Sequence, residues 1–184
     1  MSQAEISRLG PEGTRDHFEE IQRVYAVAFP KYDLGDHKRR TLRQTESAGF
    51  EAVTVREDGA LVGFAYGLPL SPRSTWWDGL QPPQLGDFTA ETGQRTFAVI
   101  DLAVLPSHRG RGLGRRLMNE LLGSRAEERA TLATDPGNGE AQRMYERWGW
   151  SKVGRTPGVE GETADAFDLY VIALRPTGEA SSSR

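Results

Sequence analysis

The chain has 184 residues, no cysteine and a formal net charge of −3. This length suits one domain with a substantial core, and the lack of cysteine excludes disulfides, cysteine-based metal sites and a thiol nucleophile. The small negative charge gives no overall attraction to nucleic acid or to an anionic membrane, so an anion site must be a local basic patch. No stretch approaches the ~20 apolar residues that span a bilayer, and the first residues lack the form of a secretory signal. We therefore expect a cytoplasmic protein without nucleic-acid or membrane partners.

The first fifty residues predict one short strand and two helices. Residues 6–9 form the expected strand. Asp16 and Glu19 have the spacing of a capping box, and the apolar residues that follow recur at helical spacing until Pro30. A second, more polar helix is expected over residues 36–48, and Gly49 ends it.

A β-hairpin and a central strand are expected in the middle of the chain. Residues 51–56 and 61–66 flank Asp58-Gly59, a dipeptide typical of a tight hairpin turn. Residues 96–105 form an apolar strand that is stopped by Pro106.

Residues 68–95, between the hairpin and the central strand, are rich in proline and glycine. They predict a long ordered loop rather than a domain boundary. This loop contains Trp76 and Trp77, which are costly to leave exposed. The two indoles either wall a pocket for an acceptor or pack the loop against the sheet, and the sequence favours neither.

The C-terminal half alternates helices with strands. One helix is expected over residues 112–128, with an apolar stripe that includes Leu117 and Leu121, and Asn138 caps another helix. Because strands and helices intermingle and one crossover joins parallel strands, we predict an α/β fold with a mixed sheet. The last three strands are expected over residues 130–134, 150–153 and 167–174.

An apolar strand, a glycine-rich turn and a helix start follow one another in the segment 99–122. The turn reads Arg109-Gly110-Arg111-Gly112-Leu113-Gly114, and Arg115 and Arg116 come next. The first amides of a helix lack internal partners and carry partial positive charge, while glycine lets an anion approach the backbone. Arginine adds charge-assisted hydrogen bonds to phosphate. The turn therefore predicts a site for a phosphorylated ligand.

The glycine spacing separates three kinds of phosphate loop. The pattern G-x-G-x-G differs from the G-x-G-x-x-G of dinucleotide folds, and the turn lacks the G-K-[ST] of a Walker-type loop. At every fixed position it resembles instead R/Q-x-x-G-x-G/A, the acyl-CoA diphosphate loop of the GNAT superfamily of N-acyltransferases. Taken alone, such a short motif also fits a glycine-rich connection with surface arginines.

A second block of sequence carries the same resemblance. Residues 138–150, NGEAQRMYERWGW, are similar to the family element N-x-x-A-x-x-x-Y-x-x-x-G-[F/W]. The similarity extends over about residues 50–174. It implies one GNAT-like domain over residues 1–176, with a mixed, mostly antiparallel sheet of six to seven strands and about four helices. Residues 177–184 have no apolar anchor and are expected to be a disordered tail. The matching positions are Asn138, Ala141, Tyr145, Gly149 and Trp150.

The resemblance also implies an activity. A GNAT-type N-acetyltransferase moves an acetyl group from acetyl-CoA to a primary amine by direct attack in a ternary complex, without a metal. Backbone groups of Leu102, Ala103 and Val104 would bond the cofactor arm, and an N–H near Val104 would stabilise the oxyanion. The diphosphate would contact Arg109, Gly110, Arg111, Gly112, Leu113, Gly114 and Arg115.

Two residues of the second block receive roles from the same resemblance. Tyr145 would protonate the departing thiolate, because a phenol stays protonated at neutral pH and can still donate. As an aromatic residue on a helix stripe, Tyr145 also fits a purely packing role. Asn138 would contact the cofactor arm, and helix capping alone also explains an asparagine at this position.

The general base is open. Some relatives carry a Glu at a position that is Ala133 here, so that role cannot be transferred. Asp101 is the remaining carboxylate on the central strand, and burial there could raise its pKa. Asp101 could equally well cap a bulge or pair with an arginine, and a water chain would also serve as the base. His108 resembles a base by residue type but is expected to be an exposed loop residue.

Two other functions compete with catalysis. A GNAT fold that binds or senses acyl-CoA without turnover is the alternative, and the presence of Tyr145 argues against it. Nucleic-acid binding through the turn is disfavoured by acidic residues on the following helix. The acceptor would be a small-molecule or peptide amine, chosen by loops that carry no recognisable signal (residues 30–48, 71–95 and 155–166). Dimers are frequent in the family, so a homodimer is open.

Overall fold

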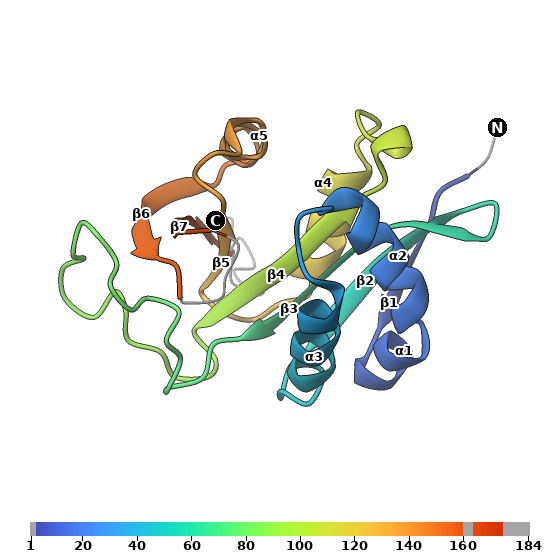
Figure 1. The fold of residues 1–184 in the computed structure, drawn as a ribbon. Helices are drawn as coiled ribbons and strands as arrows, with labels where there is room; N and C mark the ends of the chain where they lie inside the picture. The colour runs from blue at the N-terminus through green and yellow to red at the C-terminus, as the bar shows by residue number, and fades with distance from the viewer. Residues whose placement is uncertain (1–2, 160–163, 175–184) are drawn as a thin grey trace, which may run out of the picture.

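The computed structural model describes residues 3–159 and 164–174. Within them, seven strands form a single sheet in the order β1-β2-β3-β4-β5-β7-β6 (Figure 1). Neighbouring strands are antiparallel except for β4 and β5, which are parallel and are joined through α4. This confirms the predicted mixed, mostly antiparallel sheet, with five α-helices where about four were expected. The proposed single domain over residues 1–176 stays a prediction, and the tail at 177–184 lies outside the described residues.

The element boundaries follow the sequence pattern closely in the sheet and less closely in the helices. The strands are β1 (Glu5–Leu9), β2 (Glu51–Glu57), β3 (Ala60–Pro69), β4 (Thr96–Val104), β5 (Arg129–Thr134), β6 (Ser151–Pro157) and β7 (Ala166–Ala173). The helices are α1 (Pro11–Asp16), α2 (Phe18–Ala28), α3 (Leu34–Gln44), α4 (Leu113–Leu122) and α5 (Gly139–Arg147), with a short 3-10 turn at Pro106–His108.

The helix starts near the N-terminus differ from the prediction. The prediction of a capping box formed by Asp16 and Glu19 is wrong, because an earlier helix, α1, begins at Pro11 and ends at Asp16. Helix α2 therefore begins directly after His17, without a side-chain cap. Helix α3 begins earlier than expected, since the side chain of Asp33 accepts a hydrogen bond of 2.7 Å from the Asp36 N–H and so caps it.

The hairpin between β2 and β3 forms as predicted. Asp58 and Gly59 both have positive φ, 50° and 82°, as the two central residues of a type I′ turn require. The turn brings the end of β2 to one end of the sheet, where Glu57 is its last residue.

The two faces of the sheet bury different helices. Leu117 and Leu121 of α4 pack with Val53 and Val55 on one face. On the other face, helix α2 packs against the intervening residues of β2 and β3, including Phe64 and Tyr66. Helix α3 lies beside α2 in front of the sheet in Figure 1. Because side chains alternate along a strand, neighbouring positions of the same strand serve opposite layers.

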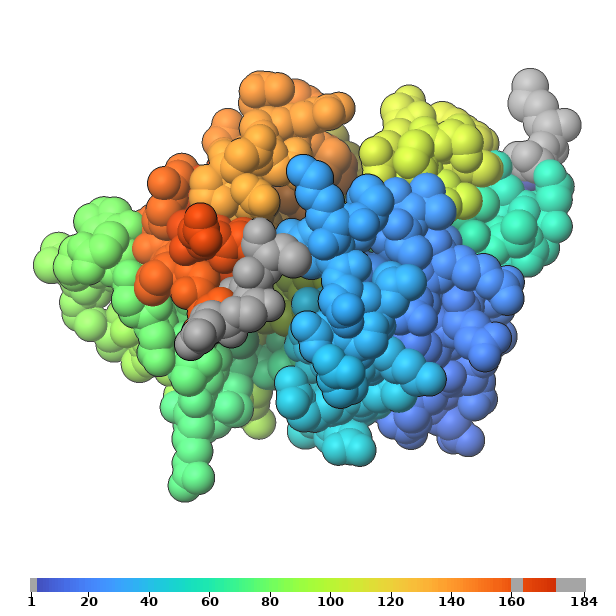
Figure 2. Space-filling view, viewed as in Figure 1, coloured from blue at the N-terminus to red at the C-terminus, as the bar shows by residue number. Residues whose placement is uncertain are grey.

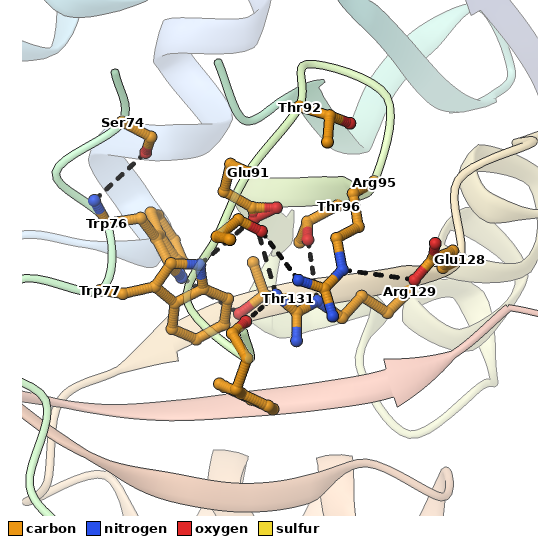
Figure 3. A network of polar contacts seen from close by, with 12 residues as sticks. Ser74, Trp76, Trp77, Glu91, Thr92, Arg95, Thr96, Glu128, Arg129 and Thr131 are labelled. Carbon is orange, nitrogen blue, oxygen red and sulfur yellow. Dashed lines mark hydrogen bonds and ion pairs between the residues drawn. The ribbon is translucent and has the colours of Figure 1, made fainter. Parts of the chain in front are cut away.

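The long loop between β3 and β4 is tied to the sheet by its two tryptophans (Figure 3). Trp77 is 5% exposed and donates from Nε1 to Glu91 at 3.3 Å, and Trp76 donates from Nε1 to Thr131 Oγ1 at 3.1 Å. The guanidinium of Arg129 lies over the Trp77 ring, 5.1 Å from its centroid. Both indoles thus anchor the loop, as the packing alternative expects, while a role in an acceptor pocket stays a prediction.

Candidate active site

Strands β4 and β5 pair at only one end. Their parallel register runs from Thr96 opposite Arg129 to Ala98 opposite Thr131. Beyond Ala98, β4 continues to Val104 while paired with β3 alone. The edge of β4 over residues 99–104 therefore faces β5 without strand pairing, and its backbone groups on that side are open to another extended chain.

The pairing of β4 with β3 determines which backbone groups face this open edge. Leu105 N–H donates to the Val62 carbonyl at 2.8 Å, and bonded pairs alternate along an antiparallel ladder. The backbone N–H and C=O groups of Ala103 consequently point toward β3, whereas those of Leu102 and Val104 point toward the open edge. Of the three residues expected to bond the cofactor arm, the geometry thus favours two.

A bulge interrupts β4 near the start of this open stretch. Tyr66 pairs with Asp101 and Gly67 with Val99, so Ile100 is an extra residue on β4. A bulge bends its strand and re-aims the neighbouring side chains. Here the Asp101 side chain is directed toward α3, where it meets Arg40.

The glycine-rich turn leads from the end of β4 into α4. Gly110 and Gly112 have φ values of 74° and 77°, which favour glycine, and Gly112 directly precedes the helix. The first helical hydrogen bond runs from Arg116 N–H to the Gly112 carbonyl. The preceding amides of α4, from Leu113 to Arg115, have no partner in the preceding turn of the helix.

The space around this turn suits an anion. A Cβ placed on Gly110 or Gly112 would meet no atom within 4 Å. The turn lies at the surface in Figure 2, where the segment is yellow-green at the top of the molecule, and Arg115 and Arg116 beside it are exposed. Free amides, a helix N-terminus and exposed guanidinium groups together fit a diphosphate.

The two arginines within the turn already contact the protein. Arg109 donates from Nε to the Val104 carbonyl at 3.1 Å. Arg111 pairs through both terminal nitrogens with Glu57 at the end of β2. His108 Nε2 also lies 3.2 Å from Glu57 Oε2, with 23% of its side chain exposed, so the expected exposed histidine is wrong. The sequence did not single out Glu57, since its partners are about fifty residues away.

Tyr145 lies on α5 against the same core as α4. Its ring packs against those of Trp148, Trp150 and Tyr170, with centroids 5.7 to 6.5 Å away. Its hydroxyl has no hydrogen-bond partner among the residues that the structure describes. Burial, and next the negative charge of Asp101, raise the pKa of Tyr145 above its usual value. The phenol therefore keeps its proton at neutral pH and has that proton free to donate.

Asp101 is held as an anion by two side chains of α3. Arg40 Nη2 donates to its two oxygens at 3.2 and 3.0 Å, and His37 Nε2 lies 3.4 Å from Oδ2. Burial alone would raise the pKa of Asp101, but the contact with His37 and the charge of Arg40 outweigh it and lower that pKa. The sequence-based expectation of a raised pKa is therefore wrong, because it could not include these partners. The carboxylate is a weak base.

His37 was not predicted to belong to this cluster. It is buried on α3, and its ring stacks on that of Tyr25 at a centroid distance of 3.6 Å. Gln22 Nε2 donates to the Leu34 carbonyl and lies 3.4 Å from His37 Nδ1, which favours the tautomer with the proton on Nε2, facing Asp101. The one available signal was the spacing of His37 and Thr41, the two buried positions of an otherwise polar helix.

Asn138 caps α5, as expected. Its side-chain oxygen accepts a hydrogen bond of 3.2 Å from the Ala141 N–H. Asn138 is an exposed residue, and its contact with a cofactor arm stays a prediction.

The described ranges contain no helix long and apolar enough to cross a membrane. In the same ranges, no three His, Cys, Asp or Glu side chains are grouped so that they could hold a metal ion.

The glycine-rich turn at the start of α4 fits a diphosphate, and comparison with known proteins identifies the family of the chain. The profile described as the acetyltransferase (GNAT) family matches residues 15–150. The chain belongs to this family. A GCN5-like protein acetyltransferase of Mycobacterium tuberculosis is 37% identical over 104 residues, which are 50% of this chain and 49% of that protein. The chain thus spans about half the length of the curated relative it matches.

Solved structures show the same fold at low sequence identity. Arabidopsis thaliana NAA60 in complex with acetyl-CoA has a TM-score of 0.65 and 18% identity, over 94% of this chain and 99% of that one. Ard1 from Thermoplasma volcanium has a TM-score of 0.64 and 17% identity, over 94% of this chain and 98% of that one. These likenesses concern the fold.

Proposed function

We propose that the protein is an N-acetyltransferase that moves the acetyl group of acetyl-CoA to a primary amine by direct attack in a ternary complex. The observation that carries this proposal is the continuity of the open edge of β4 with the glycine turn of α4, which offers one path for an extended arm ending in a diphosphate. The acetyl-CoA in the complex of the structurally similar NAA60 supports the choice of donor. A small-molecule or peptide amine as acceptor, a cytoplasmic location and a homodimer stay predictions.

In this proposal the backbone of the chain binds the donor and stabilises the transition state. Acetyl-CoA supplies the thioester carbonyl when it is bound. The amides at the start of α4 hold the diphosphate, and the backbone of Leu102 and Val104 bonds the arm. The Val104 N–H stabilises the oxyanion, a contribution of ~3 kcal/mol to the barrier for one donor.

Proton transfer is divided between a residue and solvent. Tyr145 gives its Oη proton to the sulfur that leaves. An amine with a pKa of ~10 is mostly protonated at pH 7, so it must lose a proton before it attacks. Because the pKa of Asp101 is lowered, we assign Asp101 to the ion pair with Arg40 and not to the role of general base. We propose that water accepts the proton of the amine.

The direct test is release of free thiol from acetyl-CoA in the presence of a panel of amines. Thiol release that depends on one amine class, with CoA binding seen by calorimetry, is the expected result. CoA binding without thiol release from any amine would instead indicate a binding or sensing module. Absence of CoA binding would remove the proposal altogether.

Substitutions at Asn138 separate its two roles. Asn138→Ala is expected to destabilise the protein by about 1 kcal/mol, because α5 loses its cap. Asn138→Asp keeps the acceptor and is expected to keep the stability, but it replaces the amide donor with a carboxylate. If the amide also contacts the cofactor arm, Asn138→Asp weakens CoA binding at unchanged stability. Thermal unfolding measures the stability of both variants, and calorimetry measures their affinity for CoA. Unchanged CoA affinity in both variants would show that Asn138 acts only as the cap of α5.

A further inference from the structure

Glu57 joins the β2–β3 hairpin to the glycine-rich turn before α4. It is the last residue of β2, and it is 7% exposed. Its carboxylate pairs with Arg111 through both terminal guanidinium nitrogens, and its Oε2 lies 3.2 Å from His108 Nε2. One buried carboxylate thus contacts a residue before the turn and a residue within it.

Neither element needs this contact to form. The hairpin is determined by the positive φ values of Asp58 and Gly59, and the start of α4 by Gly112. A buried carboxylate is unfavourable unless it is paired, so the pairing links two segments that are otherwise independent. The link fixes the backbone of the turn relative to the sheet.

The position of Arg111 makes this link informative. Arg111 occupies a variable position of the phosphate-loop pattern, and its guanidinium is neutralised by Glu57. Arg109 is tied through Nε to the Val104 carbonyl, at the end of the open edge of β4. The turn is therefore held on one side by Glu57 and on the other by β4, while the backbone N–H groups of residues 110–115 stay available to a ligand.

We propose that Glu57 is a positioning residue for the diphosphate site, acting through Arg111 and His108 to hold the turn in its binding conformation. This inference rests on the proposed function. In it Arg111 anchors the turn and is not a free ligand of the phosphate groups. The diphosphate is then bound by the amides of residues 110–115 and by the outer arginines Arg115 and Arg116.

The test compares Glu57→Gln with a matched control in the full-length chain. Glu20 has the same kinds of partner, Arg56 and His17, but belongs to α2, which packs on the face of the sheet opposite to α4. We expect Glu57→Gln to weaken CoA binding about tenfold by calorimetry, the factor that corresponds to losing one charge-assisted contact. Glu20→Gln is expected to leave CoA affinity unchanged.

Kinetics show whether Glu57 acts on donor binding alone. For Glu57→Gln the KM for acetyl-CoA should rise about as much as the dissociation constant of CoA, while kcat and the KM for the amine stay the same. The double variant Glu57→Gln/Arg111→Met should lose less affinity than the sum of the single variants, because the two side chains act as one unit. A residue that only stabilises the fold would lower the unfolding temperature without this split.

Whether Glu57→Gln weakens or tightens CoA binding decides between two roles of Arg111, anchor of the turn or phosphate ligand. If Arg111 were a phosphate ligand sequestered by Glu57, Glu57→Gln would release it and tighten CoA binding. Unchanged or tighter binding therefore overturns the proposal and leaves the proposed function intact, whereas failure of the wild-type protein to bind CoA removes the proposed function itself. If Glu57→Gln does not fold, Glu57→Asp keeps the charge but is too short to reach both partners, and wild-type affinity in that variant overturns the proposal equally.

Discussion

Replacing Tyr145 with Phe is expected to lower kcat about a hundredfold, the typical contribution of a positioned general acid. The substitution removes only the hydroxyl, which has no partner among the described residues, so the ring keeps its packing against Trp148 and Trp150. The affinity for CoA and the stability should therefore stay close to those of the wild type. Thiol-release kinetics, together with calorimetry, measure the effect.

Tyr170→Phe is the matched control for this substitution. Tyr170 belongs to the same aromatic group, but its hydroxyl donates to Glu146 at 3.1 Å. Its loss should cost about 1 kcal/mol of stability and leave kcat unchanged. An unchanged kcat in Tyr145→Phe would refute the role of Tyr145 as the acid.

The raised pKa of Tyr145 also predicts a pH dependence. The acid form is the active one, and the folded pKa lies above the usual value of 10.0. Loss of the phenol proton should therefore not lower kcat anywhere between pH 7 and pH 10. In a pH profile of kcat, a decline in that range that is absent from Tyr145→Phe would contradict this assignment.

Asp101→Asn is expected to be the most destabilising of the substitutions considered, by about 3 kcal/mol. The variant removes the negative charge of a carboxylate that is 9% exposed, and it leaves the partly exposed Arg40 guanidinium without its anion. Urea unfolding gives the free energy of unfolding of both proteins. Asp36→Asn removes the partner of Arg39 from an exposed pair on the same helix, and should change stability by less than about 0.5 kcal/mol.

The same ion pair predicts how stability depends on pH. The pKa of Asp101 in the folded protein is below its usual value of 3.8. The stabilisation that the Asp101 charge gives the folded protein is therefore complete above pH 3.8, and it is lost as the pH falls through the folded pKa. The difference in stability between wild type and Asp101→Asn should accordingly shrink below about pH 4. A difference that instead disappears between pH 5 and 7 would show a raised pKa and would return Asp101 to the role of general base.

The sequence by itself determined the tight turns, the start of α5 and the family. Asp58-Gly59 specifies the hairpin because few dipeptides tolerate positive φ at both positions. The glycines at 110 and 112 specify the turn for the same reason, and Asn138 specifies the start of α5 through its own side chain. In each case the residues that decide the structure are within a few positions of one another, so their spacing along the chain is the signal.

Only the tertiary structure decided which charges meet and where the sheet opens. Asp101 and Arg40 are 61 residues apart, and Glu57 and Arg111 are 54 apart, so no local pattern distinguishes these pairs from solvated charges. The bulge at Ile100 and the end of pairing at Ala98 depend on the partner strands. Pairing with His37 and Arg40 then reversed the pKa shift that burial alone would give Asp101, because the charge of a residue is encoded in the sequence but its partners are brought to it by folding.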